Sequence, residues 1–371
     1  MVVYWTAFLF ISYCSVLLSM LNSSSYKMSS SVFNFSIWSF VFCGLLFLVG
    51  LRHEVGGDWD QYLSILDSLR NLNEFDTNII NSLLGDPGYQ LIMHISLTIG
   101  AGIYGVNLLC AIIFLSGLFF FASQLPKPML AIAVAFPYLI LIVGMGYTRQ
   151  SAGIGLVMAS LIYFIRQENL KFILLVIAGA LLHKSAIIFL GLMFFNNRKF
   201  SFFRTLIMIL FFIIISLVLI AEALESMFQH YILEEYNADG AAIRLLMNAL
   251  CGAGLLLRLD KYNFSENART LVSILSKTSI VMFLLIFSGL GDVVLDRLSL
   301  YLIPIQLIFL TSFSSSINLS RVQKLSIDCI IIFLYSIVLY TWLNFATHSN
   351  YWLPYNNIVS NPLILPNVFI D

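Results

Sequence analysis

The densest group of chemically active side chains in this sequence follows its second long hydrophobic run. It occupies the stretch from Arg52 to Tyr62, which reads RHEVGGDWDQY. The carboxylates of Asp58 and Asp60 can accept a proton or hold a sugar hydroxyl. The aromatic side chains in this stretch, such as Trp59, can stack on sugar rings or anchor the chain at a membrane surface. The glycine pair before Asp58 lets the backbone turn sharply or approach a ligand. We therefore treat this stretch as the first candidate site.

The composition is that of an integral membrane protein. Hydrophobic residues make up 60% of the chain, 10% are Asp, Glu, Lys or Arg, and the mean hydropathy is +0.93. A soluble chain of 371 residues could not bury that much apolar surface. The formal net charge is zero, so no nucleic-acid partner is predicted. The five cysteines lie inside hydrophobic runs without the spacing of metal ligands, and we predict no metal and no cofactor.

The hydrophobic runs predict an all-α, polytopic membrane protein of about twelve transmembrane helices, since a bilayer core is about 30 Å thick. We expect a single integral membrane domain over residues 1–371. The predicted spans are 2–20, 33–50, 102–122, 129–147, 150–165, 171–182, 184–195, 203–221, 241–257, 271–290, 298–313 and 323–346.

The distribution of Lys and Arg sets the predicted orientation. If the loop at 21–32 is inside, most basic residues lie inside and most acidic residues lie outside. The outer side then carries a main loop at 51–101 and a second loop at 222–240. We expect residues 88–100 to form a helix along the outer membrane surface, since a thirteenth span there would move Lys127 outside.

The run at 171–195 is predicted to form two short helices that meet at His183 and Lys184. One long helix would place the basic residues Arg198 and Lys199 outside, against the same rule. Histidine titrates near neutral pH and can transfer a proton or hold a phosphate. The alternative for His183 is a helix-end histidine that is hydrogen-bonded to the backbone.

Five basic residues lie at outer helix ends, on the side that basic residues usually avoid. Guanidinium groups bind phosphate oxygens in pairs, so a ring of basic residues predicts an anionic ligand such as a lipid-linked diphosphate. The alternative is that each pairs with a nearby carboxylate, as Arg297 could with Asp296. The five are Arg52, Arg149, Lys184, Arg244 and Arg297.

Several motifs follow one another in order between residues 45 and 305. The first sets Arg52, Val55, Gly56, Asp58 and Tyr62 in the pattern R-x-x-V-G-x-D-x-x-x-Y. The later ones are Pro87-Gly88-Tyr89, Arg149-Gln150, His183-Lys184-Ser185-Ala186, Arg244, and Arg297 with Tyr301. Their order and spacing resemble the EpsG family of bacterial exopolysaccharide proteins, which is related to Wzy-type O-antigen and capsule polymerases. The chain departs from the family pattern at Gly57, where a small hydroxyl residue is usual, and at Trp59, where Tyr is usual.

The resemblance implies a polymerase of undecaprenyl-diphosphate-linked oligosaccharide repeat units. Such an enzyme is a multi-pass protein of the bacterial inner (cytoplasmic) membrane, with a GT-C-like fold and an active site facing the periplasm. Its expected partners are the lipid-linked oligosaccharide, membrane lipid and a chain-length regulator protein. The expected catalytic residues are Asp58, His183 and Arg149. The expected diphosphate-binding residues are Arg52, Arg149, Lys184, Arg244 and Arg297, and the expected sugar-binding residues are Trp59, Asp60, Tyr62 and Tyr301.

Two other functions fit parts of the same pattern. An O-antigen ligase would use the same donor, but ligases usually carry a larger late periplasmic loop than 222–240. A lipid-linked oligosaccharide transporter or flippase would line a path through the membrane with charged residues. In this sequence Lys277 and Asp328 are the charged residues that lie deep on the inner side, which favours a one-sided site.

Overall fold

The computed structural model describes residues 1–21, 30–71, 86–195, 240–288, 292–316 and 319–359. In these ranges every regular element is a helix, and one isolated backbone bridge joins Arg52 to Asn357. The predicted all-α class is confirmed. The predicted span at 203–221 and nearly all of the loop at 222–240 lie outside the described residues.

Six helical stretches in the described residues are long and apolar enough to cross a membrane. Four shorter apolar helices accompany them, at 34–50, 169–182, 184–195 and 241–257. Each predicted span that falls on described residues coincides with a helical stretch. The count of twelve spans and the GT-C-like fold stay predictions. The six longer stretches are Val2–Leu21, Gly102–Ser123, Pro128–Gly146, Glu266–Leu285, Val294–Ser314 and Arg321–Phe345.

The contacts of the chain divide it into two compact units. Unit 1 comprises Met1–Leu156, Leu181–His183 and Leu310–Asp371, and unit 2 comprises Val157–Ala180 and Lys184–Phe309. The chain passes between them within α9 (Thr148–Ile165), near the end of α10 (Asn169–Leu182), after His183, and within α15 (Pro304–Ser314). The extent of the predicted single domain stays a prediction.

Unit 1 is built around one continuous helical stretch formed by α7 (Pro128–Ala135), η1 (Phe136–Val143) and α8 (Gly144–Gly146). Of this stretch, 94% is buried. The η1 segment is a π-helix, which is consistent with Pro137, because proline lacks the N–H that a regular turn would use.

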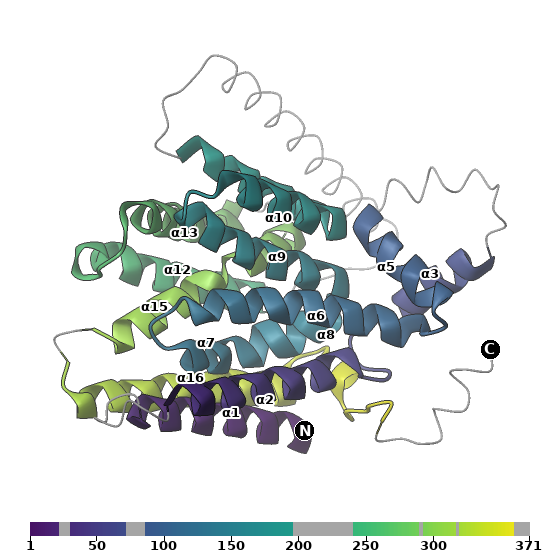
Figure 1. Ribbon diagram of the computed structural model, residues 1–371, viewed down its shortest axis with the longest axis horizontal. Helices are drawn as coiled ribbons and strands as arrows, with labels where there is room; N and C mark the ends of the chain where they lie inside the picture. The colour runs from purple at the N-terminus through teal and green to yellow at the C-terminus, as the bar shows by residue number, and fades with distance from the viewer. Residues whose placement is uncertain (22–29, 72–85, 196–239, 289–291, 317–318, 360–371) are drawn as a thin grey trace, which may run out of the picture. The chain divides into compact units, whose positions relative to one another are not determined.

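Four helices surround that stretch or pack on its neighbours. These are α1 (Val2–Leu21), α2 (Ser30–Gly50), α6 (Gly102–Ser123) and α16 (Arg321–Phe345). Contacts join α7 to α1, α6 and α16, and join α2 to α6. Figure 1 shows these helices running side by side within the unit. The start of α16 is fixed by a capping box between Ser320 and Gln323.

Two shorter helices lie on α6 at one end of unit 1. The first, α3 (Trp59–Asn71), begins inside the candidate stretch, and the second, α5 (Pro87–Thr98), covers the predicted surface helix. The helical structure of residues 88–98 is thereby confirmed, while its place at the membrane surface stays a prediction. Both helices contribute to one apolar cluster with α6.

The predicted helix break at His183 and Lys184 is confirmed, and it coincides with a boundary at which His183 belongs to unit 1 and Lys184 to unit 2. Helix α10 (Asn169–Leu182) ends there, and the 3-10 helix η2 (Lys184–Phe195) begins. Unit 2 contains α12 (Ala241–Leu257) packed on α13 (Glu266–Leu285) and on α14 (Asp292–Ser299). A short 3-10 turn, η5 (Leu300–Leu302), joins α14 to α15.

Helices α6 and α9 approach each other through glycines. A Cβ atom built on Gly117 would lie 1.9 Å from the carbonyl oxygen of Gly155, and one on Gly155 would lie 2.6 Å from the Cα of Phe114. Small residues allow this close backbone contact between membrane helices. The contact sets the position of the start of α9, which carries Arg149.

We expect Gly117→Ala to lower the free energy of unfolding by about 1–3 kcal/mol, because the added methyl group meets backbone that cannot move aside. Gly44→Ala is the matched control, since nothing lies within 4 Å of its Cβ position in α2. The midpoint of thermal unfolding in detergent measures both. Equal midpoints for the two variants would contradict the close packing of α6 and α9.

Candidate active site

The candidate site is built on a buried arginine at the end of α2. The side chain of Arg52 is 1% exposed. Its guanidinium donates to the carbonyl oxygens of Val49 (2.7 Å) and Val55 (3.0 Å). It also donates to Asn107 Oδ1 on α6 and to Thr148 Oγ1 at the start of α9, each at 2.8 Å. One charged group therefore joins α2, the loop after it, α6 and α9.

These bonds explain how a buried charge is tolerated. Burial lowers the pKa of Arg52 to about 10, which still leaves it charged at neutral pH. Four polar acceptors replace the water that the guanidinium loses. Arg52 was predicted to bind the diphosphate; in the structure its hydrogen bonds run to the protein interior, and it positions the loop.

The segment from 349 to 358 closes the loop from the other side. The backbone N–H of His53 donates to Asn356 (3.0 Å), and that of Gly56 donates to Tyr351 (2.9 Å). The indole of Trp352 donates to the carbonyl oxygen of Leu141 in the π-helix at 3.0 Å. This contribution was missed in the sequence, where the late residues carry no recognisable motif.

Gly56 meets the backbone requirement that the sequence predicted. Its φ of +112° lies in the left-handed region, and a Cβ there would lie 2.3 Å from the carbonyl oxygen of Met145. Only glycine fits both conditions. The turn leads into α3 and places Asp58 at the beginning of that helix.

Asp58 is half-buried and is held by the next turn of α3. The hydroxyl of Tyr62 donates to Asp58 Oδ2 at 3.2 Å. Burial raises the pKa of the Tyr62 hydroxyl, and the nearby charge of Asp58 raises it further. Tyr62 therefore stays protonated as a donor, and this contact holds the Asp58 carboxylate in place.

Arg149 forms the centre of the site. Its Nη1 donates to Asp86 Oδ2 at 3.1 Å, and its guanidinium carbon lies 5.8 Å from the ring centroids of both Tyr62 and Tyr89. A cation placed over the face of an aromatic ring is stabilised by a cation–π interaction. The Arg149 side chain is 29% exposed, whereas Asp86 is 3% exposed. The buried carboxylate thus fixes an arginine that an anion can still reach.

His183 reaches the same carboxylate from the break after α10. Its Nδ1 lies 3.7 Å from Asp86 Oδ2, a distance for an ion pair when the ring is protonated. A Cβ on Gly88 would lie 2.9 Å from the carbonyl oxygen of Leu181, so the α5 backbone approaches the break closely. The sequence predicted a role for His183 without naming Asp86 as its neighbour.

Unit 1 thus contains one series of neighbouring side chains. It runs from Asp58 through Tyr62 and Arg149 to Asp86 and His183. Four of these five residues were predicted as site residues. Asp86 was missed as a site residue, although it stands at the acidic position of the motif that continues as Pro87-Gly88-Tyr89, and that position was the available signal.

The predicted sugar-binding residues differ in exposure. Asp60 is exposed on α3, whereas Trp59 and Tyr62 are 7% and 3% exposed and belong to the apolar cluster of α3, α5 and α6. Tyr301, in η5 of unit 2, is 2% exposed and packs on Phe189 with ring centroids 5.6 Å apart. These three rings support the fold from inside, and their contact with sugar stays a prediction.

Unit 2 contains the other predicted basic residues. Arg244 Nε donates to Asp296 Oδ1 at 2.7 Å, so the carboxylate expected beside Arg297 pairs with Arg244. Arg297 is exposed at the last turn of α14, and Lys184 is half-buried at the start of η2. The predicted convergence of all five basic residues on one ligand stays a prediction, since it joins residues of both units.

The described part of the chain contains no cluster of three or more His, Cys, Asp or Glu that could hold a metal ion. The charged groups that the site offers an anion are organic cations.

Comparison with known protein families shows to which family the chain belongs. The model of the EpsG family matches residues 35–357, which is most of the chain. The chain belongs to the EpsG family. The match includes every predicted site residue in both units. No curated protein and no solved structure matches the chain.

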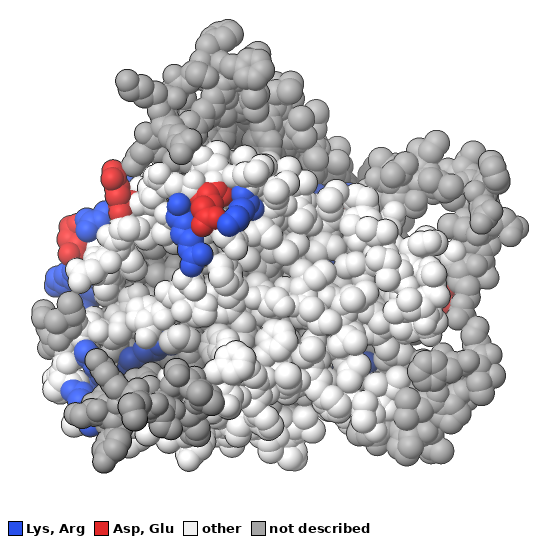
Figure 2. All heavy atoms as spheres, viewed as in Figure 1, with Lys and Arg blue, Asp and Glu red and all other residues white. Residues whose placement is uncertain are grey.

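Family membership and the apolar helices together indicate the general class of the protein. The EpsG family is associated with polysaccharide biosynthesis and glycosyltransferase-like activity. The protein is a membrane protein of this class, because its helices are long and apolar enough to span a bilayer. Figure 2 shows a visible surface that is mostly uncharged.

We expect Arg52→Met to destabilise the protein strongly, because it leaves Asn107, Thr148 and two carbonyl groups without a buried donor. Each such group costs about 1–3 kcal/mol. The measurement is the midpoint of thermal unfolding in detergent, with the exposed Arg258→Met as control. A midpoint no lower than that of the control would show that Arg52 does not join the helices.

We expect Asp86→Asn to lower the free energy of unfolding by about 1.5–3 kcal/mol, the range for a hydrogen bond to a charged group. It should also reduce glycan chain length more than the stability loss explains, because Arg149 loses the charge that orients it. Unfolding in detergent and gel analysis of surface glycan measure the two effects. The control is Asp67→Asn, which makes the same substitution at an exposed residue of α3. Full-length glycan in Asp86→Asn would exclude this positioning role.

Proposed function

We propose that the protein polymerises undecaprenyl-diphosphate-linked oligosaccharide repeat units by glycosyl transfer. The donor is a glycan carried on the lipid diphosphate, and the acceptor is a sugar hydroxyl of a second lipid-linked unit. The observation that carries the proposal is the placement of Arg149 between a buried carboxylate and two aromatic rings, in a member of the EpsG family.

The reaction requires charge stabilisation more than covalent chemistry. The acceptor oxygen forms a bond to the anomeric carbon of the donor, and the bond from that carbon to the diphosphate oxygen breaks. The diphosphate leaves with the bonding electron pair, so negative charge develops on it. A guanidinium held in place before the reaction stabilises that charge without reorganising. Arg149 supplies this group, and Asp86 holds it.

A base must take the proton of the acceptor hydroxyl. Asp58 and His183 are the two candidates, and both lie in the series of contacts that includes Arg149. Asp58 accepts a hydrogen bond from the hydroxyl of Tyr62, which holds its carboxylate in place beside the acceptor that we propose. His183 lies on the other side of Arg149, and its imidazole ring is of the type that most often serves as a general base.

The predicted orientation places this site at the periplasmic face of the inner membrane. The supporting argument is the distribution of Lys and Arg, which favours the loop at 21–32 on the inside. A lipid-linked diphosphate sits at the level of the headgroups, and the proposed orientation brings the partly exposed Arg149 to that level. Arg244, Arg297 and Lys184 of unit 2 are proposed as further contacts to the diphosphate.

The decisive experiment is elongation of a purified lipid-linked repeat unit by the purified protein. A ladder of longer glycans supports a polymerase. Transfer of glycan to a lipid A core without elongation would instead indicate a ligase. Accumulation of the lipid-linked unit across vesicles without new glycosidic bonds would indicate a transporter.

In that assay we expect Arg149→Lys to slow elongation by about 10²-fold, the usual effect of losing one stabilising donor in a transition state. Lysine keeps the charge but loses the planar fork that matches phosphate. The control is Arg166→Lys, at an exposed position beyond the end of α9. An unchanged elongation rate in folded Arg149→Lys would remove Arg149 from the proposed mechanism.

A further inference from the structure

A cavity of about 720 Å³ opens in unit 1 at the end far from the candidate site. Its wall includes the last turns of α1, the end of α6, and the starts of α7 and α16. The other end of α1 lies by the candidate site, where the hydroxyl of Tyr4 donates to the carbonyl oxygen of Trp352 at 2.8 Å. From Tyr4 to Ser19 the helix rises about 22 Å at 1.5 Å per residue. The cavity is therefore a separate site near the opposite helix ends.

The charged side chains of the wall are all cations. They are Lys127, Arg321 and Lys324, and no carboxylate is among the described residues that line the cavity. Blue side chains gather at the end of unit 1 where α16 begins (Figure 2). Anions are attracted to such a group of positive charges.

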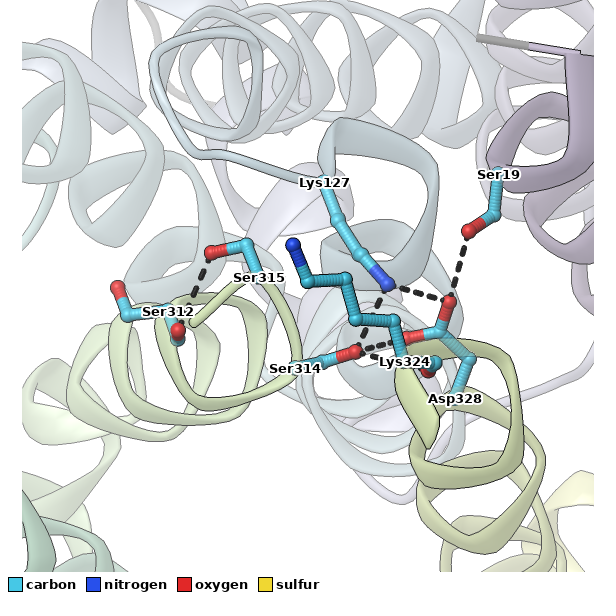
Figure 3. Close-up of polar contacts among 7 residues, drawn as sticks. All are labelled: Ser19, Lys127, Ser312, Ser314, Ser315, Lys324 and Asp328. Atoms are coloured by element: carbon cyan, nitrogen blue, oxygen red, sulfur yellow. Dashed lines mark hydrogen bonds and ion pairs between the residues drawn. The ribbon is translucent and has the colours of Figure 1, made fainter. Parts of the chain in front are cut away.

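One carboxylate lies behind the wall and neutralises only one of the three cations. Asp328 is fully buried and accepts hydrogen bonds from Lys127 Nζ at 2.6 Å, from Ser19 at 3.0 Å and from Ser314. Lys127 also donates to Ser314 at 2.8 Å. Figure 3 shows these groups converging on Asp328. The carboxylate is thus satisfied by its own neighbours, and the positive charges of Arg321 and Lys324 remain in excess.

Lys324 is the cation best placed for a ligand. Its side chain runs beside Lys127 in Figure 3, and among the described residues its ammonium group has no hydrogen bond or ion pair. Arg321 donates one N–H to the carbonyl oxygen of Met20 at 2.9 Å, which orients its guanidinium near the end of α1. Two cations that lie three positions apart, on one turn of α16, therefore border the same space.

Most of the remaining wall is apolar, and its uncharged polar residues are Ser15, Ser19, Asn34 and Ser123. It includes Leu18 of α1, Phe35 and Trp38 of α2, and Met129 and Leu325. Phe35 is 70% exposed, and the neighbouring Phe40 of α2 is 66% exposed, as expected for side chains that face lipid tails. A soluble anion would use the cations but would gain nothing from this apolar surface.

We propose that this cavity binds an acidic phospholipid, with the headgroup phosphate at Lys324 and Arg321 and an acyl chain along the apolar wall. The site lies at the predicted cytoplasmic ends of its helices, where acidic lipids attract Lys and Arg. It is independent of the proposed reaction, which uses the opposite ends of the same helices. The lipid fills the space between α1, α2 and α16 and stabilises unit 1.

The test uses the full-length protein in nanodiscs of phosphatidylcholine with a minor fraction of phosphatidylglycerol. Native mass spectrometry measures how much phosphatidylglycerol the protein retains. We expect each of Lys324→Gln and Arg321→Gln to lower the apparent affinity for phosphatidylglycerol about fivefold. The double variant should lose more than about tenfold. Phosphatidylcholine retention should stay unchanged.

A charge-matched control separates this effect from general electrostatics. The double variant Arg258→Gln and Lys261→Gln removes two exposed cations that lie outside the cavity, between α12 and α13. It should retain phosphatidylglycerol as the unchanged protein does. Thermal unfolding in phosphatidylcholine alone checks that all variants are folded.

Two results would overturn the proposal. The first is equal phosphatidylglycerol retention by the cavity double variant and the control. The second is displacement of the lipid by inorganic phosphate at the same concentration, which would indicate a soluble anion. Glycan elongation by the cavity variants is measured in parallel, so failure of the lipid site and failure of the proposed polymerase are distinguished.

Discussion

The fold of unit 1 depends on holding a charged guanidinium away from water. Arg52 is buried at the point where α2 ends, and its acceptors come from the two carbonyl groups beside it, from α6 and from α9. A buried charge without such acceptors would cost several kcal/mol. The helices must therefore meet at one fixed geometry, and the loop that carries Asp58 begins from that point.

The candidate site also depends on a buried charged group whose neighbours satisfy it. Asp86 is buried and charged, and it is tolerated because Arg149 and His183 approach it. In return it orients Arg149, whose side chain is still partly exposed. Buried groups thus determine the geometry, and partly exposed groups are left to meet the ligand. A site arranged in this way loses little energy to reorganisation when negative charge develops in it.

The sequence predicted the helices well because each span carries its own hydrophobic signal. It also predicted the break at His183, since basic residues beyond it had to stay inside, and the special conformation of Gly56. The interior position of Arg52 could not be predicted, because Asn107 and Thr148 are far away in the sequence. Asp86 was visible only as the acidic residue before a proline, and its contacts with Arg149 and His183 depend on how α5, α9 and the end of α10 pack.

The late segment has a consequence for how the protein is made. The hydroxyl of Tyr355 donates to the carbonyl oxygen of Leu48, a contact across 307 positions, and Trp352 supports the π-helix. A ribosome adds about 5–20 residues each second, so these partners emerge many seconds after the loop that they close. During that interval the early helices are already in the membrane while the loop lacks its covering segment. Closure of the site therefore waits for the late segment, and a chain stalled before residue 350 would lack the contacts that cover the loop.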